Sequence, residues 1–189
     1  MTTKEILRVN LFPNQHFLST GCRYSSKTGE GTVTYAVAAG GSDEMSLRSA
    51  DDDGFRVAYD IDGFTPGAEY VIEANVWVSG DYAPNMTAPI LIGSIDSEGA
   101  NWRGIGKSNE WKNGSARISA RFTVPSGITR IRIEFCSPKS SGAIANWNSP
   151  QLELASTYDA AKAGGGGFCS SPGTPCRETE RNRRVGGAR

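Results

Sequence analysis

The chain has 189 residues, enough for one domain with a sizeable hydrophobic core but too few for two domains of ordinary size. Its 20 lysines and arginines balance 20 aspartates and glutamates, so the net charge of zero gives no reason to expect nucleic acid or an anionic membrane as a partner. With 38% hydrophobic residues, 23 glycines and 9 prolines, the composition is typical of a globular, turn-rich protein.

Alternation of apolar and polar side chains, the period of a half-buried strand, recurs along the chain. It is present over residues 32–38 and is longest over 69–79, where Trp77 falls on the face opposite the apolar set. Residues 117–124 and 130–135 alternate in the same way, and the Pro-Ser-Gly turn between them predicts an antiparallel pair. No convincing amphipathic helix is found, and weaker strand candidates cover 55–60, 89–95 and 144–154.

Many short strands without helical crossovers predict an all-β fold, a two-sheet jelly-roll sandwich over residues 1–162. The strand pattern stops after Tyr158, and the glycine-rich stretch that follows has too little apolar surface to offset the entropy of ordering it. Residues 163–189 are therefore predicted to form a glycine-rich hinge and an extended, basic C-terminal arm.

The four cysteines fall into two pairs of different character. Cys22 and Cys136 lie in apolar, strand-like contexts and are expected to be buried small hydrophobic residues. Cys169 and Cys176 flank a turn-rich segment and could close a small disulfide loop in an oxidising setting. Two cysteines alone cannot complete a four-ligand zinc site.

Candidate residues for catalysis are few. His16, the only histidine, lies in a strand-like segment beside Phe17 and is interpreted as structural. The sequence has no nucleophile elbow, no HExxH motif and no phosphate-binding glycine loop. A glycosidase needs two carboxylates that face each other across a cleft, and outward-facing charges on a sandwich arise without that function. We expect no enzyme and no cofactor, although four glutamates lie on or beside predicted strands: Glu69, Glu73, Glu134 and Glu153.

Aromatic side chains suggest a different function, because an exposed ring can stack on a sugar while polar neighbours bind its hydroxyl groups. The preferred glycan-contact candidates are Trp102, in a loop-like segment, Trp77, on the outward face of its strand, and Tyr82. The other aromatic residues considered for such a surface are Tyr59, Trp111 and Trp147.

Four segments resemble carbohydrate-binding-like jelly-roll domains, especially those in bacteriophage tail and virion proteins. They span residues 10 to 158 and read NLFPN, FTPGAEYVIEANVWVSG, NEWKNGSARISARFTVPSGITRIRIEF and NWNSPQLELAST. In the last segment, the resemblance places Trp147, the polar pair Asn148 and Ser149, and the Gln-Leu-Glu triplet on the final core strand. It also implies that Trp111 and Trp147 pack in the core.

The resemblance bears on metal binding as well. In carbohydrate-binding relatives the polar pair is often acidic, and an aspartate there can help to bind a structural calcium ion. Here Asn148 and Ser149 are neutral, whereas calcium prefers several oxygen ligands with net negative charge. We therefore predict no metal site and interpret the acidic run at residues 51–53 as part of a turn.

The predicted function follows from the resemblance and from the arm, which carries five arginines and two glutamates. The chain is expected to be a structural subunit of a bacteriophage virion, a minor tail or tail-tip protein, located in the tail rather than the capsid. It is expected to form homo-oligomers and to contact other virion proteins. The residues predicted to fasten the arm to a neighbour are Phe168, Arg177, Arg181, Arg183 and Arg184.

Two alternatives remain open. One is a glycan-binding module that recognises host cell-surface polysaccharide, and the other is a capsid decoration or head-fibre protein. No membrane partner is expected, because no stretch of the sequence approaches the roughly 20 apolar residues that span a bilayer.

Overall fold

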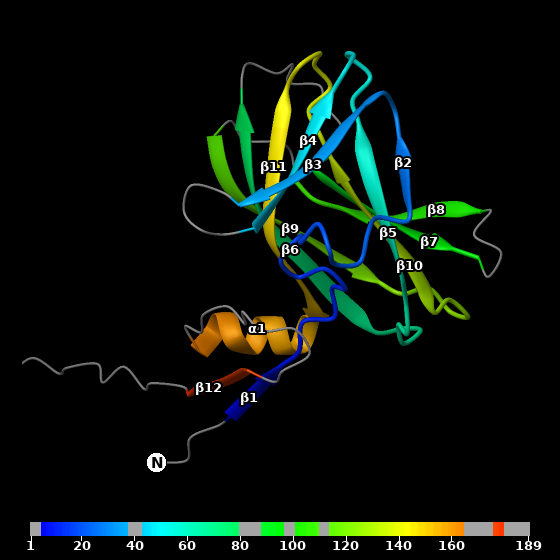
Figure 1. Cartoon of the computed structure of the whole chain (residues 1–189). Helices are drawn as coiled ribbons and strands as arrows, with labels where there is room; N and C mark the ends of the chain where they lie inside the picture. The colour runs from blue at the N-terminus through cyan, green and yellow to red at the C-terminus, as the bar shows by residue number, and fades with distance from the viewer. Residues whose placement is uncertain are drawn as a thin grey trace, which may run out of the picture.

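The computed structural model describes residues 5–37, 43–79, 88–96, 101–109, 114–164 and 176–179, with side chains between residues 8 and 163 of these ranges. Two five-stranded antiparallel sheets pack face to face, which confirms the predicted all-β jelly-roll sandwich (Figure 1). Among the described residues, no helix combines the length and the apolar character needed to cross a membrane.

Each sheet is named here after its central strand. The β10 sheet has the order β2 (Ser26–Thr28), β5 (Arg56–Asp62), β10 (Arg130–Cys136), β7 (Ile90–Ile95) and β8 (Trp102–Lys107). The β11 sheet has the order β3 (Gly31–Val37), β4 (Asp43–Ser49), β11 (Ile144–Leu154), β6 (Glu69–Ser79) and β9 (Gly114–Thr123). The alternating segments of the sequence all lie in these strands, because one face of each sheet must be apolar to form the core.

The hydrophobic core fills the space between the sheets. Its centre is an aromatic cluster in which the rings of Phe12 and Tyr59 lie 4.9 Å apart and those of Phe135 and Trp147 lie 5.0 Å apart. The Trp147 ring is fully buried, and its indole nitrogen donates a hydrogen bond to the carbonyl of Cys136. Trp147 is therefore a core residue, as the resemblance implied, and Trp111 lies outside the described residues.

The predicted pairing of residues 117–124 with 130–135 is wrong. Strand β9 pairs with β6 in one sheet, whereas β10 pairs with β5 and β7 in the other. The turn at Pro125, where the amide of Ile128 donates to the Pro125 carbonyl, carries the chain across the sandwich instead of closing a hairpin. Alternation shows which face of a strand is buried, but both sheets of a sandwich satisfy it equally.

A helix, α1 (Ala155–Gly164), follows β11 directly, although no amphipathic helix was predicted. Its sequence has only small buried residues, Ala155 and Ala161, so the hydrophobic period is weak. Polar side chains attach α1 to the sheet instead: Thr157 donates to Glu153, and Asp159 pairs with Arg121. The helix also runs through residue 162, where the end of the sandwich domain was predicted.

Part of the predicted arm pairs with the chain's own N-terminus. Strand β12 (Cys176–Thr179) is antiparallel to β1 (Glu5–Arg8), with Arg177 opposite Leu7. This strand pair lies beside α1, near the end of the sandwich (Figure 1). The other predicted arm contacts, Phe168, Arg181, Arg183 and Arg184, lie outside the described residues, as does Cys169 of the predicted disulfide, and only the backbone of Cys176 is described.

The structure also shows where Cys22, Cys136, His16 and the acidic run at residues 51–53 lie. Cys136 is buried as predicted, but Cys22 is exposed, because it lies in an irregular segment after a turn and not in a strand. His16 is half-buried and belongs to the turn at residues 13–16, so its strand-like context was also wrong. The acidic run forms a turn as predicted, with the Asp51 carboxylate accepting a hydrogen bond from the Asp53 amide.

Candidate functional site

The outer face of the β11 sheet carries a row of polar and aromatic side chains from three neighbouring strands. In strand register, Trp77 of β6 lies between Asn146 of β11 and Ser115 of β9. One step along the strands, Asn75 lies between Asn148 and Arg117. Side chains two residues apart point to the same face of a strand, so the two rows form one surface.

This surface contains an open groove, here called the Trp77 groove. It is lined by Asn75, Val76, Trp77, Ser115, Ala116, Arg117 and Asn148, and its volume is about 390 Å³. That volume falls within the range of roughly 300–1,000 Å³ that small-ligand sites occupy. Trp77 is 44% exposed on the outward face that the alternation predicted, so its ring is available to a ligand.

A chain of hydrogen bonds fixes the polar side chains of the groove. The Asn75 amide nitrogen donates to the Asn148 side-chain oxygen over 3.0 Å, and the Asn75 oxygen accepts from Arg117 Nη1 over 2.8 Å. Arg117 Nη2 in turn lies 3.0 Å from an oxygen of Glu73, a carboxylate that is only 2% exposed. The Arg117 charge is thereby balanced within the protein, and the groove presents amide groups in defined orientations.

A bulge in β11 begins directly after Asn148, at the end of the groove. The register between β11 and β6 shifts between Asn148 and Gln151, and Ser149 adopts a positive φ of 50°. The loop formed by these residues is held by Asn10, whose side chain donates to the Pro150 carbonyl and accepts from the Leu152 amide. Of the polar pair, Asn148 therefore lines the groove, and Ser149 belongs to the bulge beside it.

Helix α1 closes one end of this face. Tyr158 donates a hydrogen bond to Glu73 over 3.2 Å, and Glu73 is the next outward residue on β6 after Asn75. Val71, one step further, is buried although it points outward, because α1 packs against this part of β6. The helix thus covers the part of β6 that follows the groove, on the same face of the sheet.

The predicted glycan-contact residues do not form one site. Trp77 lies in the groove, but Trp102 begins β8 in the β10 sheet, on the other side of the sandwich, and it belongs to a strand instead of a loop. Tyr82 lies outside the described residues. Tyr59 and Trp147 are buried in the core, which excludes both from a surface site.

The residues that sequence reasoning missed are Asn75, Arg117 and Asn146. Asn75 lies two residues from Trp77 on the same strand, so the alternation could have predicted its outward position. The contact of Asn75 with Arg117 joins residues 42 positions apart, and no local pattern shows which strands become neighbours.

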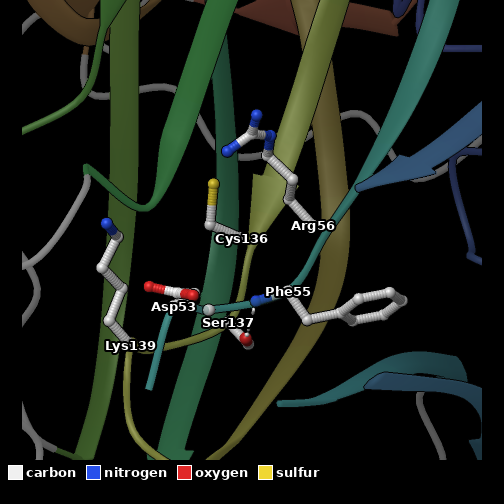
Figure 2. Close-up of a pocket in the computed structure, with 7 residues that line it drawn as sticks. Asp53, Phe55, Arg56, Cys136, Ser137 and Lys139 are labelled. Atoms are coloured by element: carbon white, nitrogen blue, oxygen red, sulfur yellow. Dashed lines mark hydrogen bonds between the residues drawn. The ribbon is translucent and has the colours of Figure 1, made fainter. Parts of the chain in front are cut away.

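A second, smaller hollow lies between β5 and β10 and holds at most one water, since its volume is about 10 Å³. Figure 2 shows the side chains of Arg56 and Cys136 pointing in the same direction from the two strands, while the Phe55 ring points away from them. Burial raises the pKa of the Cys136 thiol to about 12. The thiol is therefore protonated at neutral pH and is a poor nucleophile.

The four glutamates considered for hydrolysis are each held in an ion pair. Glu73 pairs with Arg117 and Glu153 with Arg8, and all four of these side chains are at least four-fifths buried. The other two, Glu69 and Glu134, pair with Arg121 and Arg56 respectively. Glu134 lies in the β10 sheet, across the core from the rest. In the described part of the chain, no three His, Cys, Asp or Glu side chains are grouped as a metal site would require.

Comparison with known proteins finds solved structures that have a similar fold. Among solved structures with a similar fold, tailspike protein 4 of bacteriophage CBA120 gives a TM-score of 0.56 at 19% identity, over 77% of this chain and 21% of the tailspike chain. A CBM22-1 xylan-binding domain of Paenibacillus barcinonensis gives 0.53 at 10% identity, over 81% and 96% of the two chains. The C-terminal family 22 carbohydrate-binding module of a Clostridium thermocellum protein gives 0.55 at 15% identity, over 78% and 96%. These likenesses show a shared fold.

Comparison of the amino-acid sequence, in addition to the fold, shows which family the chain belongs to. A comparison with curated proteins finds no match. A family model described as a carbohydrate binding domain, however, matches residues 9–165, which include both sheets and helix α1. The chain therefore belongs to the carbohydrate binding domain family.

Proposed function

We propose that the domain binds polysaccharide in the Trp77 groove, without catalysing a reaction. The observation that carries this proposal is the exposed Trp77 ring at a groove in which hydrogen bonds join the side chains of Asn75, Asn148 and Arg117. The apolar face of a pyranose can stack on the indole, and Asn75 and Asn148 can exchange hydrogen bonds with its hydroxyl groups. Membership of the carbohydrate binding domain family supports the same function.

The charges of the groove favour a neutral sugar. Arg117 is its only lining residue with a formal charge, and Glu73 lies 3.0 Å from the guanidinium. An anionic sugar would have to compete with a buried carboxylate for this cation, which is costly because Glu73 would lose its partner. The ligand expected here is a neutral β-linked or α-linked hexose or pentose polymer.

The experiment that tests this proposal is a binding screen with the full chain against a panel of soluble polysaccharides, including xylan and bacterial cell-wall glycans, followed by calorimetric titration. We expect retention by at least one neutral polysaccharide and a loss of affinity of about tenfold or more in Trp77→Ala, because stacking is removed. Val37→Ala is the matched control, since Val37 is an exposed apolar residue of the same sheet, 67% exposed, outside the groove.

Two results would contradict the proposal. One is a wild-type chain that no polysaccharide in the panel retains. The other is unchanged affinity in Trp77→Ala, with the same folded state as the control by circular dichroism, which would show that the ligand binds elsewhere.

The more specific role of virion subunit stays a prediction. The likeness to a bacteriophage tailspike supports it only through a shared fold, and the matched region is about a fifth of that tailspike chain. Homo-oligomer formation, contacts with other virion proteins and location in the tail or the capsid likewise remain predictions. Hydrogen exchange of residues 164–189 in the isolated chain and in a purified particle tests whether the arm contacts a neighbour there, with protection expected only in the particle.

A further inference from the structure

Each sheet of the sandwich ends in two edge strands. These are β2 and β8 in the β10 sheet, and β3 and β9 in the β11 sheet. The outer backbone N–H and C=O groups of an edge strand can pair with a strand of another chain. Natural proteins usually prevent such pairing with very short edge strands, charged side chains, prolines or bulges.

Three of these edge strands carry such protective features. β2 has only three residues, and one of them is Lys27. β8 contains Arg103 and Lys107, and its pairing with β7 has an irregular register. β9 contains Arg117 and Arg121, and it also packs against β8 along that side of the sandwich. These three edges are therefore poor templates for a further strand.

The remaining edge strand, β3, has none of these features. Its seven residues, GTVTYAV, include no charged residue and no proline, and all seven pair with β4 in a continuous register. None of the seven is buried, and within the described ranges none has a backbone hydrogen bond apart from the pairing with β4. Most are β-branched or aromatic, the residue types that favour strands. β3 is therefore an open template for strand pairing.

The inward side chains of β3 are also incompletely covered. Val33 and Tyr35 pack against the hydrophobic core but remain only partly buried. On the neighbouring strand β4, the inward residues Met45 and Leu47 are fully buried, because β4 has a strand on both sides. A strand added beside β3 would cover apolar surface as well as satisfy backbone groups.

The sequence of β3 is suited to pairing with a second copy of itself. In an antiparallel pair about a twofold axis through Thr34, Val33 of one copy lies opposite Tyr35 of the other. The two Thr34 side chains then face each other on the outer side of the sheet. Pairs of an aromatic with a β-branched residue, and of two threonines, are among the favourable cross-strand pairs. Inward residues meet inward residues throughout this register, so the faces of the two sheets match.

The charges of β4 favour the same register. Arg48 lies beside Thr32 and Glu44 lies beside Ala36 on the outward face. When the pair is centred on Thr34, Thr32 of one copy lies opposite Ala36 of the other. Arg48 of each copy then shares a row with Glu44 of the other copy, whereas a shift by two residues in either direction takes these opposite charges out of the same row.

We propose that β3 is a dimerisation edge, through which two copies of the chain pair antiparallel about Thr34 and join their β11 sheets into one continuous sheet. A twofold contact of this kind uses the same strand of both copies, so assembly stops at the dimer. The inference is independent of the proposed function, because the Trp77 groove lies on the far strands of the sheet, β6 and β9, and on β11. Val37 lies opposite Gly31 in this pair and gains no side-chain partner, so the Val37→Ala control used above should still dimerise.

The first test measures the mass of the full chain by sedimentation equilibrium over a wide range of concentrations. We expect a dimer that dissociates on dilution. Thr34→Lys should weaken the association about tenfold or more, because it places two like charges opposite each other across the axis. The matched control is Ser119→Lys, which adds the same charge at an exposed position of β9, the other edge strand of the same sheet. Urea denaturation checks that both variants are folded.

The second test examines the register by cross-linking. It uses the full chain with Cys22, Cys169 and Cys176 replaced by serine, so that only the buried Cys136 remains. In this background Thr34→Cys should form a covalent dimer on mild oxidation, because the two thiols face each other across the axis. Ala36→Cys is the control: residue 36 lies opposite Thr32 of the second copy, so it should not cross-link.

Three results would overturn this inference. The first is a wild-type chain that is monomeric at every concentration. The second is a dimer that persists in Thr34→Lys but dissociates in Ser119→Lys, which would place the interface on β9. The third is a covalent dimer from Ala36→Cys and none from Thr34→Cys, which would exclude the register. Trp77→Ala should dimerise like the wild type, so failure of the groove proposal and failure of this one appear in separate measurements.

Discussion

The Tyr158 hydroxyl of helix α1 donates a hydrogen bond to the Glu73 carboxylate of β6 over 3.2 Å, which connects the helix to the ion-pair partner of Arg117 in the Trp77 groove. Glu73 also pairs with Arg117, and Arg117 contacts Asn75, so one continuous network runs from α1 to the groove. The position of the groove side chains therefore depends on a helix that follows the last strand of the sandwich.

Replacement of Tyr158 by phenylalanine leaves one oxygen of the buried Glu73 without its donor. Because an unsatisfied buried acceptor is costly, we expect the free energy of unfolding to fall by about 1–3 kcal/mol in urea denaturation. The control is Ser156→Ala, an exposed position on the same helix, which should leave the unfolding midpoint almost unchanged. Equal midpoints in the two variants would show that α1 is attached in some other way.

The buried ion pair between Arg8 and Glu153 joins β1 to the end of β11. Both side chains are at most 3% exposed, and Arg8 Nε donates to a Glu153 oxygen over 3.1 Å. Arg8→Met leaves a buried carboxylate without its cation, and we expect a loss of about 3–5 kcal/mol in the free energy of unfolding. The double variant Arg8→Met with Glu153→Leu should recover much of that loss, because neither charge then remains buried. A double variant no more stable than the single one contradicts this account.

Gly93 and Trp102 should show strong coupling in a double-mutant cycle. The three atoms nearest to a Cβ on Gly93 all belong to Trp102, so Gly93→Ala forces the ring off its seat. We expect Gly93→Ala to shift the tryptophan fluorescence to the red and to cost clearly more in the wild-type background than in Trp102→Ala. Equal costs in both backgrounds would mean that the ring does not occupy the position described here.

Glu134 should make stability depend on pH. Burial raises the pKa of its carboxyl above the ordinary value of 4.5, against the opposing effect of the Arg56 and Arg132 charges. The folded chain therefore holds this proton to higher pH than the unfolded chain, and its contribution to stability falls as pH rises above 4.5. Relative to Glu134→Gln, the free energy of unfolding of the wild type should therefore fall as the pH rises from 4.5 through the raised pKa of the folded state. Val37→Ala, which changes no titratable group, should run parallel to the wild type, and a parallel profile in Glu134→Gln would contradict the pKa shift.

The sequence by itself was sufficient for the fold class and for the outward position of Trp77. Alternation over residues 69–79 placed Val76 in the core and Trp77 outside, and the structure confirms both positions. This succeeds because a strand in a sandwich has one buried and one exposed face, so a period of two is enough to assign sides. The same local rule cannot identify a partner strand, which is why β9 and β10 were wrongly paired.

Tertiary structure alone decided which polar residues accompany each tryptophan. Asn148 reaches Asn75 only because β11 and β6 are neighbours in the sheet, with the two residues directly opposite each other in register. Trp102 looked like a loop residue, and its contact with Gly93 became visible only when the pairing of β7 with β8 brought the two together. Helix α1 was missed because its attachment consists of single polar contacts to residues far away in the sequence, such as the one between Tyr158 and Glu73. Local patterns record burial, whereas the composition of a surface site depends on strand order, which long-range packing sets.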